Sequence, residues 1–265
     1  MDTTEIIRSY YDSSVETEWE RIDNRPEFLI TCRYIDRYVK AGDKVLDIGG
    51  GPGRYSLWLA QKGCDVTMLD LSPQNVDFAK KKATEGGLAL NALVGDARTV
   101  DDIVEGVFDA VLLMGPLYHL LEESDRIKAI NASLRLLKPN GVIFVSFINV
   151  FSGMIYAMKF DPPVIMDGFE SEFYKAVLED RSFAGEAFTQ AFFIHQRDVL
   201  PFMAQFSLEK LHYFGQESIT SPCENNIMSQ PKEIVDAWLD MSEKLAERED
   251  LLSWSEHLMY VGRKL

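Results

Sequence analysis

The chain has 265 residues, of which 46% are hydrophobic and 26% charged, a composition typical of a globular protein with a full core. Its 42 acidic residues outnumber 27 Lys and Arg. The resulting net charge of −15 disfavours a nucleic-acid partner, because such partners are bound largely through cationic side chains. Three scattered cysteines without a C-x-x-C pair fit neither a disulfide framework nor a zinc cluster, and we expect no metal.

The first 148 residues predict a helical cap followed by alternating strands and helices. Residues 1–40 are expected to be helical, with a break at Pro26. The expected strands are 44–48, 65–71, 89–94, 108–114 and 142–147. The helices expected between them are 54–61, 75–82, 100–105 and an amphipathic segment around 127–137. This alternation predicts a doubly wound, parallel α/β sheet with helices on both faces and a ligand crevice at the carboxyl ends of its strands.

Beyond residue 148 the pattern is looser. A helix at 197–205, a strand at 208–214, a helix at 232–248 and a strand at 257–261 are expected. We interpret the chain as one domain, residues 1–265. Its parts are a helical cap (1–40), a ligand-binding core (41–148), a substrate-covering insertion (149–195) and the C-terminal part of the sheet with its helices (196–265).

An uncharged run at residues 141–158 raises the question of a membrane span, which needs about 20 predominantly apolar residues. The run contains Ser146, Asn149 and Ser152, so we interpret it as a buried strand that leads into the insertion. The N-terminus lacks the basic and apolar regions of a signal peptide. We therefore expect a cytoplasmic protein without a membrane partner.

A glycine-rich loop follows the first strand, in the sequence Val45-Leu-Asp-Ile-Gly-Gly-Gly-Pro-Gly-Arg54. Glycines there let the backbone approach a ligand closely. The spacing is not that of the dinucleotide fingerprint, because its third glycine falls on Arg54. Asp47 would repel a pyrophosphate but attract a cation, by roughly 4 kcal/mol at about 4 Å and an effective dielectric near 20. The loop therefore favours a cationic ligand.

Two further acids end the next two strands. Asp70 is placed to accept hydrogen bonds from a vicinal diol such as ribose, a feature that dinucleotide sites share. Asp96 ends the third expected strand and could accept from an adenine amino group. Together with Asp47, these acids are expected to line one crevice.

On these residues the chain resembles the class I S-adenosyl-methionine-dependent methyltransferases, similar to small-molecule members of the ubiquinone/menaquinone type. The resemblance covers residues 40–148 and weakens toward Ser255-Glu-His-Leu-Met-Tyr-Val-Gly-Arg-Lys264. It implies a Rossmann-like sheet of seven strands, the last one antiparallel, and S-adenosyl-L-methionine as cofactor. The implied cofactor-binding residues are Asp47, Gly49, Gly50, Gly51, Asp70, Leu71, Asp96, Ala97, Met114 and Gly115.

Candidate catalytic and covering residues surround the expected crevice. Tyr118 and His119 are the polar candidates near the transferred methyl, with His119 as a possible general base or merely a packed residue at the rim of the cleft. Tyr11 and Trp19, with Tyr10 and Arg21, could close over the cofactor or simply pack on the sheet. His195, His212 and His257 are expected to be structural, with His257 ordering the C-terminal edge. Aromatics of the insertion could line an acceptor pocket or form its core: Phe169, Phe173, Tyr174, Phe183, Phe188, Phe192 and Phe193.

The function predicted from the sequence is direct displacement at a sulfonium methyl by a small-molecule acceptor. An RNA or protein methyltransferase is the alternative within enzymes, and the charge argues against it. A non-catalytic cofactor-binding protein and an NAD-dependent oxidoreductase are alternatives of other kinds.

Overall fold

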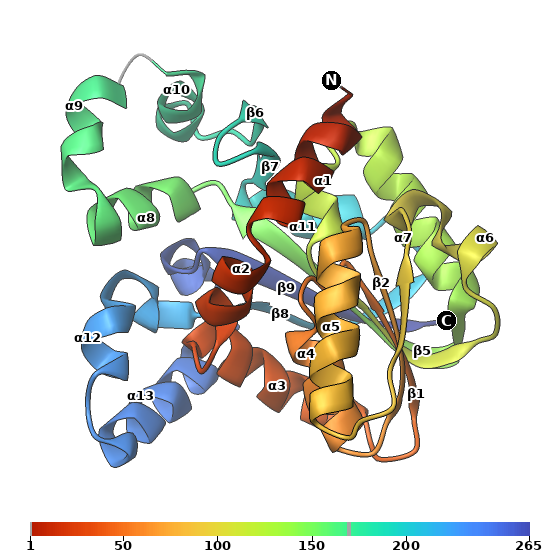
Figure 1. Ribbon diagram of the computed structural model, residues 1–265. Coiled ribbons are helices and arrows are strands. Elements are labelled where there is room, and N and C mark those ends of the chain that lie inside the picture. The colour runs from red at the N-terminus through yellow and green to blue at the C-terminus, as the bar shows by residue number, and fades with distance from the viewer. Residues whose placement is uncertain (1, 169–170) are drawn as a thin grey trace.

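The computed structural model describes residues 2–168 and 171–265 (Figure 1). The cap consists of α1 (Thr3–Ser13), α2 (Val15–Ile22) and α3 (Pro26–Tyr38), and Pro26 stands in the first turn of α3, where its missing N–H costs nothing. The core that follows is β1 (Lys44–Ile48), α4 (Arg54–Gln61), β2 (Asp65–Asp70), α5 (Pro73–Glu85), β3 (Asn91–Val94), α6 (Val100–Ile103), β4 (Phe108–Leu113), α7 (Glu123–Leu136) and β5 (Leu137–Asn149).

The remaining chain folds into further helices and strands. The insertion contains α8 (Ser152–Phe160), α9 (Ile165–Gly168), α10 (Glu172–Leu178), β6 (Phe183–Glu186) and β7 (Gln190–Ile194). The C-terminal part contains α11 (Gln196–Met203), β8 (Leu208–Gly215), α12 (Glu224–Met228), α13 (Lys232–Leu245) and β9 (His257–Lys264).

Within the described residues the strands form one sheet of nine, in the order β3-β2-β1-β4-β5-β7-β6, with β9 also paired to β5 and β8 paired to β9. Strands β1 to β5 pair in parallel, and β9 runs antiparallel to both neighbours, as the family resemblance implies. The expected count of seven is wrong by two. The extra strands are β6 and β7, which pair with each other as a hairpin. The hairpin joins the sheet through β7, which pairs with β5 only at Ile148 and Asn149.

Helices cover both faces of the sheet, as predicted. On one face, α3, α4 and α13 pack against alternate residues of the central strands, including Val45, Leu112 and Phe144. On the other face, α7 and α11 cover the intervening residues, including Leu46, Val111 and Ile143. All six of these strand side chains are fully buried. Because both faces of the sheet are covered, the sequences of these strands are almost continuously apolar.

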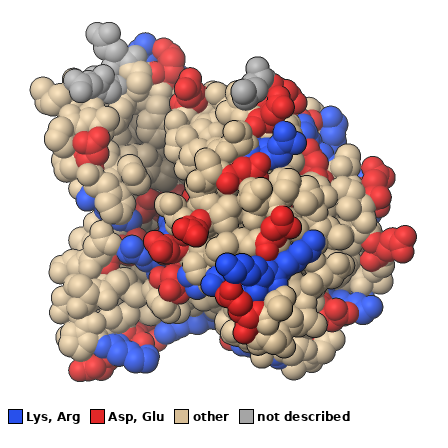
Figure 2. Space-filling view, viewed as in Figure 1, with Lys and Arg blue, Asp and Glu red and all other residues tan. Residues whose placement is uncertain are grey.

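The insertion forms a separate lobe beside the carboxyl edge of the sheet (Figure 1). The molecule is hollowed between this lobe and the C-terminal helices (Figure 2). Tyr156, Met158 and Phe160 of α8 are each more than half exposed. Among the helices that the structure describes, none has the length and apolar character needed to cross a bilayer.

Candidate active site

A cavity of about 320 Å³ opens at the carboxyl ends of the parallel strands, beneath α1 and α2. Loops that follow β1, β2, β3 and β4 form its floor, as expected for a doubly wound sheet. The predicted residues that line it are Tyr11, Asp47, Gly49, Gly50, Gly51, Asp70, Leu71, Asp96, Ala97, Met114, Gly115, Tyr118 and His119. Residues from five separate segments thus meet in one place.

Asp47, at the centre of the cavity floor, is buried with one oxygen unpaired. Its Oδ2 accepts a hydrogen bond from Ser56 Oγ at 2.7 Å, whereas Oδ1 has no partner among the described residues. Burial raises the pKa of Asp47 to about 6, against the hydrogen bond from Ser56 and with the neighbouring Asp70 adding to the rise. A buried carboxylate with a free oxygen suits a cationic ligand, which would supply both a hydrogen bond and the missing charge.

The glycine loop leaves room for such a ligand. Gly51 has φ +55° and lines the cavity, and a Cβ built on it would meet no atom within 4 Å. A side chain there would therefore project into the cavity. Gly49 is needed for packing within the protein itself, because a Cβ there would lie 2.3 Å from Cδ of Pro116 in the loop after β4.

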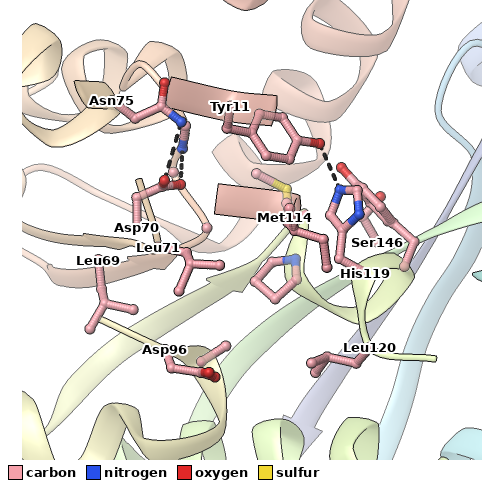
Figure 3. A pocket seen from close by; sticks show the side chains of 18 of the residues that line it. Tyr11, Leu69, Asp70, Leu71, Asn75, Asp96, Met114, His119, Leu120 and Ser146 are labelled. Atoms are coloured by element: carbon pink, nitrogen blue, oxygen red, sulfur yellow. Dashed lines mark hydrogen bonds between the residues drawn. The ribbon is translucent and has the colours of Figure 1, made fainter. Parts of the chain in front are cut away.

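Asp70 anchors the second wall of the cavity (Figure 3). Its Oδ2 accepts from the Gly51 amide at 2.8 Å, and Oδ1 accepts from the Ser72 amide and from Asn75 Nδ2 at 2.9 and 3.1 Å. Three of about four acceptor positions are thus filled by the protein, and the fourth is available to a ligand hydroxyl. Asp70 therefore also fixes the position of the glycine turn.

Asp96 lies at the far end of the cavity, next to Ala97. Both of its oxygens accept from Arg98 Nε at 3.0 Å, and Arg98 in turn bonds to Asp125 at 2.9 Å and to Thr4 of α1 at 3.1 Å. Much of the acceptor capacity of Asp96 is therefore used by Arg98. The proposed adenine contact remains a prediction.

His119 joins the N-terminal cap to the insertion. Its Nδ1 lies 3.1 Å from the Gln190 carbonyl oxygen, which can only accept, so Nδ1 carries the proton. Its Nε2 then accepts from the Tyr11 hydroxyl at 2.6 Å (Figure 3). Burial lowers the pKa of His119 to about 4, although the hydrogen bond to Gln190 acts in the opposite direction. A neutral imidazole with both nitrogens engaged is a poor general base at neutral pH.

We expect His119 to stay neutral, in the Nδ1–H form, between about pH 5.5 and 8. Its imidazole signals in ¹H–¹⁵N correlation spectra should not move over this range, because protonation would have to occur near pH 4. The signals of His119 are identified as those that are missing from the spectrum of His119→Gln. A titration of His119 near the ordinary histidine value would contradict the arrangement of its hydrogen bonds.

Tyr10 does not line the cavity, and neither does Trp19. Its ring stacks under the guanidinium of Arg54 at 3.4 Å and packs against Phe78 of α5. Trp19 therefore holds α2 onto α4 and α5 and does not cover the cavity.

The aromatic residues of the insertion divide between a core and a surface contact. Phe173, Phe183 and Phe193 pack against one another in the core of the lobe. Phe188 is half exposed and contacts Tyr10 of α1. None of the described aromatics predicted for this segment lines the cavity, and Phe169 lies outside the described residues.

Of the residues at the polar end of the cavity beyond β4, only Arg21 was named from the sequence as a candidate site residue. The residues there are Glu18, Arg21, Glu27, Ser146 and Gln216. Ser146 Oγ donates to Gln216 Oε1 at 2.6 Å, and Gln216 Nε2 donates to Thr31 Oγ1 at 3.0 Å. They come from helices and strands far apart in the chain, so no spacing in the sequence could have connected them.

Methyltransferases are among the known proteins with similar sequences and folds. Residues 45–141 match a family described as a methyltransferase domain. A ubiquinone biosynthesis O-methyltransferase of Actinobacillus pleuropneumoniae serotype 7 (strain AP76) is 34% identical over 184 residues, which are 61% of this chain and 75% of that enzyme. An enzyme of the same name from Xanthomonas axonopodis pv. citri (strain 306) is 36% identical over 113 residues, which are 43% of this chain and 46% of that enzyme.

A solved structure extends the likeness to nearly the whole chain. The 1,6-didemethyltoxoflavin-N1-methyltransferase of Burkholderia thailandensis, with bound 1,6-didemethyltoxoflavin and S-adenosylhomocysteine, has a TM-score of 0.61 and 15% identity. The match covers 98% of this chain and 88% of that one. The sequence similarity, the fold and the position of the cavity all indicate the same family. The chain belongs to the class I S-adenosyl-methionine-dependent methyltransferases, and it is similar to the small-molecule members that include the ubiquinone biosynthesis O-methyltransferases.

Proposed function

We propose that this enzyme transfers the methyl group of S-adenosyl-methionine to a hydroxyl oxygen of a small-molecule acceptor. The similarity to enzymes named O-methyltransferases supports oxygen as the nucleophile. The observation that carries the proposal is one continuous cavity, which joins the three acids at the carboxyl ends of β1, β2 and β3 to a polar end beyond β4. Cofactor and acceptor would therefore lie end to end along the edge of the sheet.

The cofactor end is assigned residue by residue. We propose that Asp47 Oδ1 pairs with the ammonium group and that Gly49, Gly50 and Gly51 let the backbone contact the methionine part. Asp70 and Leu71 would hold the ribose, and Asp96 and Ala97 the adenine. Met114 and Gly115 would border the methyl group, since they precede the turn that carries Tyr118.

The cofactor supplies an activated methyl group with a good leaving group, so the protein mainly orients the two reactants and excludes water. Tyr11 and Tyr118 would border the reacting atoms and limit access of water, because both line the cavity near His119. The enclosed, acidic cavity suits a small acceptor better than a phosphate backbone. We therefore propose that no nucleic acid is involved.

Two measurements test this function. Calorimetry should show binding of S-adenosyl-homocysteine and none of NAD. Incubation with methyl-labelled S-adenosyl-methionine and a panel of small hydroxylated and amino metabolites should give a product whose mass increases by one methylene unit. Tight NAD binding, or cofactor binding without transfer to any small molecule in a cell extract, would contradict the proposal.

We also propose that the cap and the insertion close together over bound substrates. Helix α1 is tied to the core through Asp12, which accepts from Ser72 Oγ at 2.5 Å, and to the insertion through the chain Tyr11–His119–Gln190. The contacts between α1 and β7 are few, and the surface between these two elements is exposed to solvent. The contacts between α1 and the insertion can therefore break, and the two segments can separate, without disturbing the sheet.

Hydrogen exchange should show this closure. We expect amides of α1 and of the insertion (149–195) to exchange more slowly when S-adenosyl-homocysteine and an accepted substrate are bound together, while β1 and β4 change little. Equal exchange in both segments with and without ligands would contradict the closure and leave the cofactor assignment intact.

A further inference from the structure

Two glutamates of the cap, Glu18 on α2 and Glu27 on α3, line the polar end of the cavity. Their side chains are only 14% and 15% exposed. Arg21 donates to Oε2 of Glu18 at 2.9 Å and to Oε2 of Glu27 at 3.2 Å. Oε1 of each glutamate has no partner among the described residues, and neither oxygen is sealed from solvent. One guanidinium thus serves two carboxylates.

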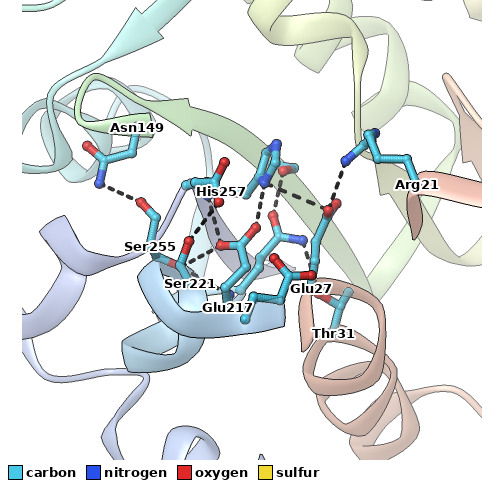
Figure 4. A network of polar contacts seen from close by, with 12 residues as sticks. Arg21, Glu27, Thr31, Asn149, Glu217, Ser221, Ser255 and His257 are labelled. Atoms are coloured by element: carbon cyan, nitrogen blue, oxygen red, sulfur yellow. Dashed lines mark hydrogen bonds and ion pairs between the residues drawn. The ribbon is translucent and has the colours of Figure 1, made fainter. Parts of the chain in front are cut away.

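The charges around these two glutamates do not balance. Glu27 lies between Arg21 and a buried histidine–carboxylate pair (Figure 4). In that pair, Nδ1 of His257 is 2.6 Å from Oε1 of Glu217. Burial lowers the pKa of His257, but Glu27 and Glu217 raise it to about 9, so the ring is a cation at neutral pH. Three carboxylates therefore face two cations, and one largely buried negative charge lacks the pairing that such a charge needs.

The next layer of charges is balanced and does not offset this excess. Glu224 and Glu256 both accept from Lys159, at 2.8 and 2.7 Å, and Glu224 also pairs with Arg25 at 3.3 Å. Two carboxylates meet two cations there. The excess negative charge therefore stays at the cavity.

The hydroxyl of Tyr55 is another polar group at this end that lacks a partner. Tyr55 lines the cavity and is 7% exposed, and its hydroxyl has no hydrogen-bond partner among the described residues. Burial raises the pKa of Tyr55, and the charge of Glu27 adds to the rise, so the hydroxyl lies near that glutamate. A buried hydroxyl without a partner is costly, and a ligand that supplied one would offset this cost.

The groups at this end that remain available to a ligand are largely hydrogen-bond acceptors. Ser146 Oγ donates its proton to Gln216 Oε1 at 2.6 Å, so it can only accept from a ligand. The two glutamate Oε1 atoms can likewise only accept. A primary ammonium group has three donors, no acceptor and one positive charge. It therefore matches both the hydrogen-bonding pattern and the excess charge.

We propose that the acceptor carries an ammonium group, and that Glu18 and Glu27 bind this group through their Oε1 atoms. The inference rests on the methyl transfer to a small molecule proposed above, and it names the class of acceptor as a hydroxylated amine. Arg21 is a positioning residue, since it holds both carboxylates by their other oxygens. Because both glutamates belong to the cap, the bound ammonium would also hold α2 and α3 over the cavity.

This site is distinct from the one proposed for the ammonium group of the cofactor. That group is assigned to Asp47 at the end of β1, whereas Glu18 and Glu27 come from the cap. Burial raises the pKa of Tyr118, and Glu27 and Glu18 add to the rise, so both acids act on a residue that we propose borders the reacting atoms. The ammonium group would therefore lie on the acceptor side of the transferred methyl.

The test compares tyramine, tyrosol and 4-hydroxyphenylacetate, which share one phenolic ring and end in an ammonium, a hydroxyl and a carboxylate group. With S-adenosyl-homocysteine bound, calorimetry at neutral pH should show tyramine binding at least about tenfold more tightly than tyrosol, because charge-assisted hydrogen bonds are about twice as strong as neutral ones. 4-Hydroxyphenylacetate should bind more weakly than tyrosol, because the excess charge repels its carboxylate. Equal binding of tyramine and tyrosol, no binding of tyramine, or a preference for the carboxylate would overturn the inference.

Substitution of one glutamate should reduce the preference for tyramine. Glu18→Gln keeps the size of the side chain and an oxygen for Arg21 but removes the charge, so tyramine should bind about fivefold more weakly and tyrosol as before. The double variant Glu18→Gln/Glu27→Gln should bind both compounds alike. Glu20→Gln is the matched control and should keep the preference, since Glu20 is exposed on the same helix and does not line the cavity. A merely structural role of Glu18 would weaken binding of both compounds equally.

The outcomes also separate the inference from the proposed function. If Glu18→Gln weakened binding of S-adenosyl-homocysteine as much as that of tyramine, the glutamates would hold the cofactor, and the inference alone would be overturned. Methyl transfer only to compounds without an amine would have the same consequence. Failure of the wild type to bind S-adenosyl-homocysteine would instead overturn the proposed function.

Discussion

Replacement of Asp70 by alanine is expected to weaken binding of S-adenosyl-homocysteine at least about tenfold, because each charge-assisted hydrogen bond to the ribose is worth about 1.5–3 kcal/mol. The structure adds a second reason. The Gly51 amide loses its acceptor in this variant, so the glycine turn is no longer held in place. Titration calorimetry of the purified variant measures the loss.

The matched control is Asp65→Ala, at the exposed start of the same strand, which should bind the ligand as the wild type does. Asp70→Ala leaves the Ser72 and Asn75 donors without their partner, so its melting temperature should fall while its circular dichroism spectrum is retained. Undiminished affinity in a folded Asp70→Ala protein would remove Asp70 from the cofactor site.

The core of the sheet could be predicted because its signals are local. Residues 44–48 are an apolar run that ends in glycines, and the structure gives β1 these same bounds. Pro73 was expected in a first helical turn and begins α5, with Ser72 as a cap that accepts from the Asn75 amide. Where each signal lies within a few residues of the element it determines, the prediction is confirmed.

The insertion was harder to predict because tertiary contacts determine its structure. Helix α8 has apolar residues around most of its circumference, including Ile155, Tyr156 and Met158, so it lacks an amphipathic period. Strands β6 and β7 are short, and their pairing to β5 depends on Ile148 and Asn149. No element bounds were therefore predicted for residues 149–195, where the described part of the structure has four short helical segments and a hairpin.

The candidate site likewise contains residues that could be predicted from local sequence signals and residues that only tertiary packing brings together. Asp47 and Asp70 lie at the carboxyl ends of β1 and β2, and Asp96 follows β3. A parallel sheet brings such positions to one edge without further information. Glu27, Glu217 and His257 meet only because α3, the segment after β8 and the start of β9 pack together. The sequence assigned His257 an ordering role at the C-terminal edge, and the contact of its Nδ1 with Glu217 Oε1 at 2.6 Å could be found only in three dimensions.

A second large effect is expected from Gly51→Ala, which should weaken cofactor binding roughly a hundredfold, equal to about 3 kcal/mol. The new methyl group would meet no protein atom within 4 Å and would project into the cavity that we propose holds the cofactor. Steric exclusion of the ligand is therefore the main consequence. Calorimetry with S-adenosyl-homocysteine measures it.

Alanine at φ +55° also costs about 1–2 kcal/mol of folding stability, because its Cβ crowds the backbone in the left-handed region. Gly87→Ala is the control for this cost, since Gly87 has φ +64° and open space around it but lies outside the cavity. Both variants should lose similar amounts of stability in urea denaturation, and only Gly51→Ala should lose the ligand. If Gly87→Ala weakened binding as much, the loss would come from destabilisation of the fold, and Gly51 would have no direct part in holding the cofactor.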